Sequence, residues 1–303
     1  MENYEIRYCK LSEVDKLQQF IDKYWKKNHI LAHNKELLDY QHKNTLENRY
    51  NFVVAHNVVT NEFDVILGFV PRNQYDSSYK NKDIWLAIWK KNEEQLPRGL
   101  GKKLLDFLED DYKPSSIGSI GINDTIEQLY LKRGWKSGVL NLWYFIKPNK
   151  LISFEKSNLK EKDYYVNPFS KSNAYYENRY DKHPFYNYKT FQGVVYRKIE
   201  TELGTCLRIV DFKQIFYLDG YYLNEILTTE NADYIDCLNH GISDDQFHEM
   251  GFHKRADNML ITQWFEPLDQ GVKNIKFAYK SENEFIIMKG DSDQDRPNLI
   301  KEL

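Results

Sequence analysis

Residues 95–112 read QLPRGLGKKLLDFLEDDY, and our prediction of the architecture starts from them. The segment PRGLG (97–101) predicts an irregular loop, because proline lacks an N–H group and glycine adopts backbone angles that other residues avoid. Leucines at helical spacing then predict an amphipathic helix over Lys102–Tyr112. A glycine loop before a helix presents unpaired backbone N–H groups and the positive end of the helix dipole. The stretch therefore predicts a phosphate-binding site, near the positive charges of Arg98 and Lys102.

The loop differs from the best-known nucleotide-binding motifs. It lacks the Lys-Ser/Thr pair that follows the glycines of a P-loop. Antiparallel strands are expected before it, whereas the glycine loop of a Rossmann unit opens its domain. An ordinary tight turn before a helix is therefore the alternative interpretation, and the surrounding elements have to decide between the two.

Strands and helices are predicted on both sides of the loop. Before it, the periodicity predicts a strand over Tyr4–Tyr8, helices capped by Ser12 and Asn34, a hairpin of Phe52–Ala55 with Val65–Val70, and a strand over Asp83–Trp89. After it, we expect a small-residue strand over Ser116–Asn123, a helix that Asp124 caps and Gly134 ends, and a last strand over Val139–Ile146.

The second half of the chain repeats much of this order. Its expected elements are strands over Phe191–Ile199, Thr205–Phe212 and Ala232–Asn239, a helix over Tyr221–Leu227, a short helix in DDQFHEMGF (244–252) and a strand in NMLITQWF (258–265). The glycine loop has no counterpart, because KQIFYLDGYYL (213–223) offers one glycine and an acidic residue.

We therefore predict a mixed α/β (α+β) fold of two tandem domains. Each has a mixed, largely antiparallel sheet flanked by helices. The predicted domains are residues 1–148 and 149–303, joined by a linker at Pro148–Lys162. A length of 303 residues suits two domains of ordinary size.

Composition excludes some classes of function. A net charge of −3 is atypical of a nucleic-acid-binding protein, so no nucleic-acid partner is expected. The three cysteines (Cys9, Cys206, Cys237) lack metal-ligand spacing, and their odd number suits a reducing compartment. The N-terminal residues resemble no signal peptide, and no apolar run reaches the roughly 18 residues of a membrane span. We expect a soluble cytoplasmic protein without a bound metal.

The loop and the following strand and helix resemble the GNAT acetyltransferase superfamily. Members carry R/Q-x-x-G-x-G/A after the fourth strand and Y-x-x-x-G-F at the end of the helix after the fifth. Here Gly99-Leu100-Gly101 and Tyr130-Leu-Lys-Arg-Gly134-Trp135 are similar to these motifs. The family's Gln or Arg falls at Leu96, which puts the details of the loop in doubt. The resemblance covers roughly Tyr4–Ile146 and implies acetyl-CoA as co-substrate.

The resemblance also implies roles for individual residues. Tyr130 would be the general acid that protonates the leaving thiolate. The residues implied to bind the cofactor are Ile88, Trp89, Lys90, Arg98, Gly99, Leu100, Gly101, Lys102 and Asn123. His29 is the first choice of general base, because imidazole titrates near neutral pH. His33, Glu93, Glu94 and water are the alternatives, and an ordinary loop histidine is the structural interpretation of His29.

In the C-terminal segment GDSDQDRPN (290–298), Asp291, Asp293 and Asp295 alternate, and Arg296 lies beside them. It lacks the glycine and the distal glutamate of a calcium loop, so a solvated tail is one interpretation. Together with HIL…KELLDYQ and DIWLAIWK, however, it resembles proteins of bacterial surface-polysaccharide (O-antigen or capsule) pathways. That resemblance implies an N-acetyltransferase for a nucleotide-linked amino sugar. Asp293, Asp295 and Arg296 are then candidates for binding this acceptor.

Two alternatives remain at the sequence level. A Fem-type aminoacyltransferase also pairs GNAT-like domains, but neither its coiled-coil arm nor a basic face is evident. A non-catalytic module that binds CoA is the other. The sequence leaves the oligomeric state open between monomer and homodimer, and it does not identify the sugar.

Overall fold

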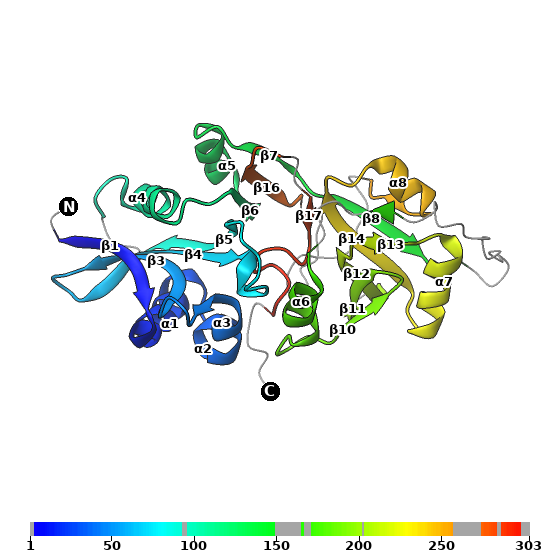
Figure 1. Cartoon of the computed structure of the whole chain (residues 1–303), viewed down its shortest axis with the longest axis horizontal. Coiled ribbons are helices and arrows are strands. Elements are labelled where there is room, and N and C mark those ends of the chain that lie inside the picture. The colour runs from blue at the N-terminus through cyan, green and yellow to red at the C-terminus, as the bar shows by residue number, and fades with distance from the viewer. Residues whose placement is uncertain are drawn as a thin grey trace. The chain divides into compact units, whose positions relative to one another are not determined.

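The structure is a computed structural model, and it describes residues 3–92, 96–148, 165–166, 171–201, 203–256, 274–283 and 286–297. The chain forms two compact units (Figure 1). Unit 1 comprises Met1–Ser137, Phe277–Glu282 and Arg296–Leu303, and unit 2 comprises Gly138–Lys276 and Asn283–Asp295. Each compact unit contains segments from both halves of the chain. The expected boundary between two domains after residue 148 therefore stays a prediction. In the described residues, no helix is long and apolar enough to cross a membrane.

The sheet of unit 1 has the strand order β1-β3-β4-β5-β6-β16-β7, and β2 also pairs with β3. Its strands are β1 (Tyr4–Lys10), β2 (Lys43–Asn44), β3 (Arg49–Asn57), β4 (Glu62–Pro71), β5 (Asp83–Lys91), β6 (Ser116–Ile122), β7 (Lys136–Val139) and β16 (Lys276–Lys280). The strands from β1 to β5 pair antiparallel, whereas β5 and β6 are parallel. The predicted hairpin is confirmed, with Phe52 opposite Gly68.

Helices cover both faces of this sheet (Figure 1). One face carries η1 (Leu11–Glu13), α1 (Val14–Phe20), the π-helical turn η2 (Ile21–Trp25), α2 (Ile30–His33) and α3 (Lys35–His42); the other carries α4 (Leu100–Phe107) with its π-helical continuation η4 (Leu108–Tyr112), and α5 (Asp124–Leu131). A short 3-10 turn, η3 (Arg72–Gln74), follows β4. Alternating strand residues supply two apolar clusters, one under each helix layer.

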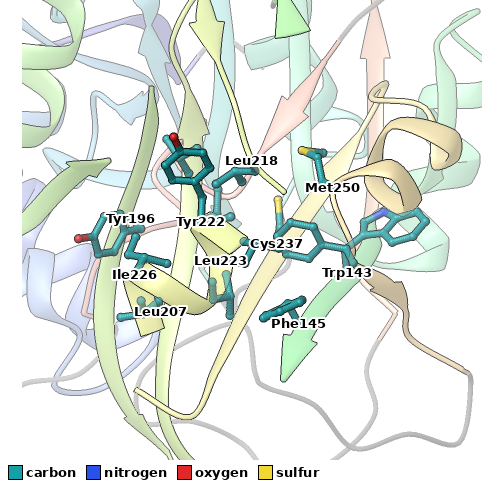
Figure 2. Close-up of a cluster of buried hydrophobic side chains, with 14 of the residues drawn as sticks. Trp143, Phe145, Tyr196, Leu207, Leu218, Tyr222, Leu223, Ile226, Cys237 and Met250 are labelled. Atoms are coloured by element: carbon teal, nitrogen blue, oxygen red, sulfur yellow. The ribbon is translucent and has the colours of Figure 1, made fainter. Parts of the chain in front are cut away.

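The sheet of unit 2 has the strand order β10-β11-β12-β14-β8-β15, and β17 also pairs with β14. Its strands are β8 (Asn141–Ile146), β10 (Tyr188–Phe191), β11 (Val194–Thr201), β12 (Gly204–Phe212), β14 (Tyr234–His240), β15 (His253–Lys254) and β17 (Ile287–Met288); β9 (Tyr165–Val166) and β13 (Ile215–Phe216) form a separate pair. Its helices are α6 (Asn173–Tyr176), the π-helical turn η6 (Glu177–Asp181), α7 (Gly220–Thr229) and α8 (Asp244–Glu249). Figure 2 shows its apolar core, in which residues of α7 pack with Trp143 and Cys237.

The expected internal repeat is present in the described elements. In unit 1, β5 and β6 are parallel and α4 connects them; in unit 2, β12 and β14 are parallel and α7 connects them. Each pair is followed by a short helix, α5 or α8, and then by an edge strand, β7 or β15. The mixed α/β class with two similar sheets is therefore confirmed. The expected strand at 258–265 lies outside the described residues.

Several local predictions were wrong. Val139–Ile146 is not one strand of the first sheet: Leu140 interrupts it, and β8 pairs with β14 in the sheet of unit 2. Conversely, β16 from the second half lies between β6 and β7. Asn123, not Asp124, caps α5, because its side chain accepts the Ile126 N–H at 3.0 Å.

Three element boundaries also differ from the prediction. The helical turn η1 already begins at Leu11, so Ser12 is not a cap. The helix after PRGLG begins at Leu100, two residues early. The predicted strand Phe191–Ile199 is broken between β10 and β11, where Gln192 and Gly193 both have positive φ.

Candidate functional site

The parallel strands β5 and β6 part after four paired residues. Their pairing runs from Asp83 opposite Ser116 to Leu86 opposite Ser119, and in the described residues it goes no further. The last part of β5, Ala87–Lys91, therefore leaves its β6-facing edge without a strand partner while its other edge stays paired with β4. An open edge of this kind offers backbone N–H and C=O groups to an extended ligand.

A bulge in β5 explains why the strands part here. Leu67 of β4 lies opposite Trp89, and Phe69 lies opposite Leu86, so two steps along β4 match three steps along β5. The extra residue changes the direction of the side chains that follow. Leu86 packs in the cluster under α4, whereas Ile88 packs in the cluster under α1–α3. Trp89 consequently lies on the α4 side, together with the glycine loop.

The glycine loop sets the start of α4. Gly99 is the N-cap residue with φ +82°, a left-handed conformation that favours glycine. In the described residues no side chain caps the helix, although the Leu100 N–H donates to the Pro97 carbonyl at 3.2 Å. A Cβ atom at Gly101 would lie 3.6 Å from Nε1 of Trp89, so the first turn of α4 lies beside this part of β5.

The same helix start fits a phosphate group. Arg98 and Lys102 are exposed beside the loop, and Leu100 anchors it in the core. N–H groups of a first helical turn that no side chain caps, together with the helix dipole, favour an anion. The predicted loop residues therefore lie together, and Gly101 lies next to Trp89 on the open part of β5.

The corresponding helix of unit 2, α7, has a side-chain cap at its N-terminus. Asp219 is the N-cap of α7, and its carboxylate accepts the Tyr222 N–H at 2.9 Å. A negative side chain thus occupies the position that a phosphate would take, and it would repel one. The lack of a second glycine loop in the sequence has this structural consequence.

Tyr130 lies close to the point where β5 and β6 part. Its side chain is almost fully buried and lies beside Ser119, the last residue of β6 that pairs with β5. Its ring lies 6.3 Å from that of Trp89 and stacks on Trp135. Burial raises the pKa of Tyr130 well above its ordinary value, although Ser119 and the charge of Arg133 oppose the rise. The phenol is thus protonated at neutral pH.

Ion pairs hold α5 against α4. Arg133, just after α5, binds Asp106 and Glu109 at 2.7 Å each. The guanidinium joins the helix that carries Tyr130 to the helix that follows the glycine loop. The sequence analysis did not select Arg133. An arginine three positions after Tyr130 does not by itself indicate an ion pair with another helix.

His29 starts a helix. It is the N-cap of α2, its Nδ1 accepts the Leu31 N–H at 3.3 Å, and the side chain is fully buried. A ring nitrogen used in this way has no lone pair to receive a proton, so the structure assigns His29 a local structural part, and its role as base stays a prediction. His33 is exposed and pairs with Asp22 at 2.7 Å. Glu93 and Glu94 lie outside the described residues.

The C-terminal segment is buried from Gly290 to Arg296, so the interpretation of this part as a solvated tail is wrong. Asp295 binds Arg197 through two guanidinium nitrogens, at 2.9 and 3.0 Å, and accepts the Tyr188 hydroxyl at 2.5 Å. Burial alone would raise the pKa of Asp295, but the charges of Arg197 and Lys289 outweigh it and hold this pKa well below the ordinary value.

Neighbouring residues of the segment are bound within unit 2 as well. Arg179 donates to the carbonyls of Gly290 and Ser292 at 3.0 and 2.7 Å. A Cβ atom at Gly290 would lie 2.2 Å from the Tyr180 hydroxyl, so only glycine fits there. Asp293 accepts hydrogen bonds from Ser292 and Gln294.

Arg296 follows Asp295 directly in the chain and is buried as well. The proposed contact of Asp293, Asp295 and Arg296 with an acceptor stays a prediction.

The sequence analysis gave no role to Ser119 and named Trp135 only as part of the motif that contains Tyr130. In the structure Ser119 lies beside Tyr130, and Trp135 stacks on its ring. The small residues of SIGSIGIN were noted, yet nothing local distinguishes Ser119 from Ser116. Gly118 has a comparable hidden role, because a Cβ there would lie 2.4 Å from the Trp85 ring.

No protein-family model matches the sequence, and no curated protein sequence matches it. Solved structures do match the fold. A GCN5-related N-acetyltransferase from Anabaena variabilis has a TM-score of 0.50 at 12% identity, with 92% of this chain and 73% of that chain covered. A putative acetyltransferase from Pyrococcus horikoshii has a TM-score of 0.47 at 10% identity, with 93% and 91% covered. The chain therefore has the fold of a GCN5-related N-acetyltransferase, a mixed α/β architecture with two sheets flanked by helices.

Proposed function

We propose that the chain is an N-acyltransferase that moves the acetyl group of acetyl-CoA to an amine. The observation that carries this proposal is the parting of β5 and β6 beside the start of α4, which no side chain caps among the described residues. An open strand edge suits the amide groups of a pantetheine arm, and the helix start suits a pyrophosphate. Both features belong to unit 1.

The residues of this site then have separate parts. Backbone groups of Ile88, Trp89 and Lys90 hold the extended arm and the acyl oxygen. The first turn of α4 at Gly99–Gly101 holds the phosphates, and the exposed Arg98 and Lys102 add positive charge. Asn123 contributes by capping α5 and so fixing the helix that carries Tyr130.

Tyr130 is the proposed general acid. Acetyl-CoA supplies a thioester whose sulfur leaves as a thiolate. As the amine nitrogen bonds to the acyl carbon and the C–S bond breaks, the Tyr130 hydroxyl gives its proton to sulfur, and the amine loses its own proton to water. Burial raises the pKa of Tyr130, so the phenol carries its proton at neutral pH and has one to give to the thiolate.

The acceptor is proposed to be an amino-deoxy sugar, carried by a nucleotide. Support for this finer proposal comes from the sequence resemblance to proteins of surface-polysaccharide pathways. The alternatives of an aminoacyltransferase and of a non-catalytic CoA-binding module make different predictions: the first needs aminoacyl-tRNA, and the second binds CoA without turnover.

A thiol-release assay tests the proposal. The full chain is incubated with acetyl-CoA and, one at a time, simple alkylamines, free amino sugars and nucleotide-linked amino sugars, and each N-acetyl product is identified by mass spectrometry. Amine-dependent release with a nucleotide-linked amino sugar is expected. CoA binding without release with any amine would favour the binding module, and release with alkylamines alone would retain the transferase but remove the sugar.

A further inference from the structure

A polar cavity lies at the far end of α4–η4 in unit 1. Its volume is about 350 Å³, and Tyr8, Glu47, Arg49, Lys80, Lys82 and Asp111 are among its lining residues. Asp111 is eleven residues after Leu100, so the cavity lies roughly 17 Å along the helix from the glycine loop. None of its lining residues belongs to the proposed acyl-transfer site.

Arg49 is the unusual residue of this cavity. Only 7% of its side chain is exposed, and the guanidinium lies over the Tyr8 ring at 3.8 Å. Nε and Nη2 both bind one carboxylate oxygen of Glu47 at 2.5 Å. Nη1 is buried and has no hydrogen-bond partner in the described part of the chain. A buried guanidinium nitrogen without an acceptor is costly, so the arrangement calls for an oxygen atom from elsewhere.

The charges around the cavity favour an anion. Arg49, Lys80 and Lys82 contribute three positive charges, against two carboxylates, Glu47 and Asp111. Both carboxylates are engaged, Glu47 by Arg49 and Asp111 by the Tyr8 hydroxyl at 2.8 Å.

The two lysines have no carboxylate partner. Lys80 and Lys82 are exposed, and Lys82 donates to the Tyr112 carbonyl at 2.9 Å. Neither lysine pairs with a carboxylate within the described ranges. The positive charge of the lining thus exceeds what its own carboxylates neutralise.

We propose that this cavity is a second ligand site, which binds a small molecule through a carboxylate or phosphate group. Nη1 of Arg49 donates to the oxyanion, Glu47 and Tyr8 fix the plane of the guanidinium, and Lys80 and Lys82 supply long-range attraction. Arginine is suited to this task because its donors have a fixed geometry. The site is separate from the acyl-transfer chemistry, and it does not depend on the proposed function.

Calorimetric titration tests the proposal on the full chain. Inorganic phosphate and succinate are titrated separately into the protein without CoA. The variants are Arg49→Gln and the double change Lys80→Gln with Lys82→Gln. A matched control, Lys26→Gln with Lys27→Gln, removes the same charge from exposed residues of unit 1 that do not line the cavity.

One saturable site is expected for at least one probe. Arg49→Gln should weaken it by about 10- to 100-fold, because a charged hydrogen bond is lost. The Lys80/Lys82 variant should weaken it several-fold, and the Lys26/Lys27 variant should not change it. Binding of phosphate alone or succinate alone identifies which oxyanion the natural ligand carries.

Two results would overturn the proposal. One is the lack of saturable binding of either probe at about 10 mM. The other is unchanged binding in Arg49→Gln, provided that its thermal midpoint and circular dichroism spectrum show a folded protein. If Arg49→Gln does not fold, the two double variants are compared instead. Equal weakening of anion binding in the Lys80/Lys82 and Lys26/Lys27 variants, or no weakening in either, would overturn the proposal.

Discussion

The phenol ring of Tyr130 lies flat on the indole ring of Trp135, with ring centroids 4.2 Å apart and an angle of 7° between the planes. The chain reverses direction at Gly134, whose φ is +77°, and the Trp135 N–H then donates to the Tyr130 carbonyl at 3.1 Å. The stack restricts the Tyr130 ring, which also lies beside Ser119. A general acid needs this fixed orientation, because proton transfer depends on geometry before it depends on pKa.

Tyr130→Phe should lower kcat by about 10²–10⁴-fold and leave the acetyl-CoA dissociation constant nearly unchanged. The phenyl ring keeps the stack on Trp135, so the loss is confined to the proton. Thiol release and calorimetry measure the two quantities. Because burial raises the pKa of Tyr130, the native enzyme should show no loss of rate from tyrosine ionisation up to about pH 10. A kcat within twofold of native, with chemistry rate-limiting, returns Tyr130 to a packing role.

Gly101→Asp should abolish CoA binding, whereas Gly101→Ala should reduce it only slightly. A Cβ atom at this position meets Trp89 Nε1 at an ordinary 3.6 Å, so alanine fits and the aspartate differs by its charge. Calorimetry should give one CoA per native chain, because Asp219 occupies the equivalent helix start in unit 2. Equal affinities for the two variants, or a stoichiometry of two, would contradict this assignment.

His29→Ala should destabilise the protein by about 1 kcal/mol or more, since it removes the N-cap of α2, and His29→Asn should cost less because asparagine caps well. The pH–rate profile of the asparagine variant should match that of the native enzyme. Urea unfolding and steady-state kinetics measure these effects. Loss of the acidic limb of the profile in a stable His29→Asn protein would instead support a role as base.

Asp295→Asn should destabilise unit 2 by about 3–5 kcal/mol, because Arg197 is left buried without its charge partner. The folded-state pKa of Asp295 lies below its unfolded value, so its contribution is full above about pH 4 and is lost as the pH falls further. Asp244→Asn, in the exposed pair with Lys254, is the control and should cost at most about 1 kcal/mol. Equal losses in the two variants would contradict the buried pair. Deletion of Gly290–Leu303 also removes Asp295 and its buried contacts. The stability of the truncated protein must therefore be measured before a change in acceptor binding can be interpreted.

Lys289→Met should remove part of the pH dependence of stability. Burial lowers the pKa of Lys289 to about 7, although Asp295 opposes this shift. Between this pH and about 10.4, the unfolded state binds a proton that the folded state does not, so stability from this group rises with pH. Urea unfolding at about pH 7 and pH 9 measures the effect. The native protein should gain stability relative to Lys289→Met over this range, and parallel pH curves for the two proteins would refute the shift.

Local signals predicted the elements that depend on neighbours in sequence. The β3–β4 hairpin, the Asn34 cap and the helix after PRGLG were all predictable, because alternation, capping side chains and glycine conformations act within a few residues. The lack of a second glycine loop was equally visible, and Asp219 is its structural counterpart.

Tertiary structure alone decided which strands pair and what surrounds each buried side chain. The local sequence of an apolar strand such as β8 does not specify which strand it pairs with. Its partner β14 lies about 90 residues further along the chain, so only the tertiary structure shows the pairing. The same reason places Ser119 on Tyr130 and Arg197 on Asp295. The aspartates of the C-terminal segment look like a solvated tail because composition reports only an average environment. The burial of Asp295 follows from partners 98 residues or more away, Arg197 and Tyr188.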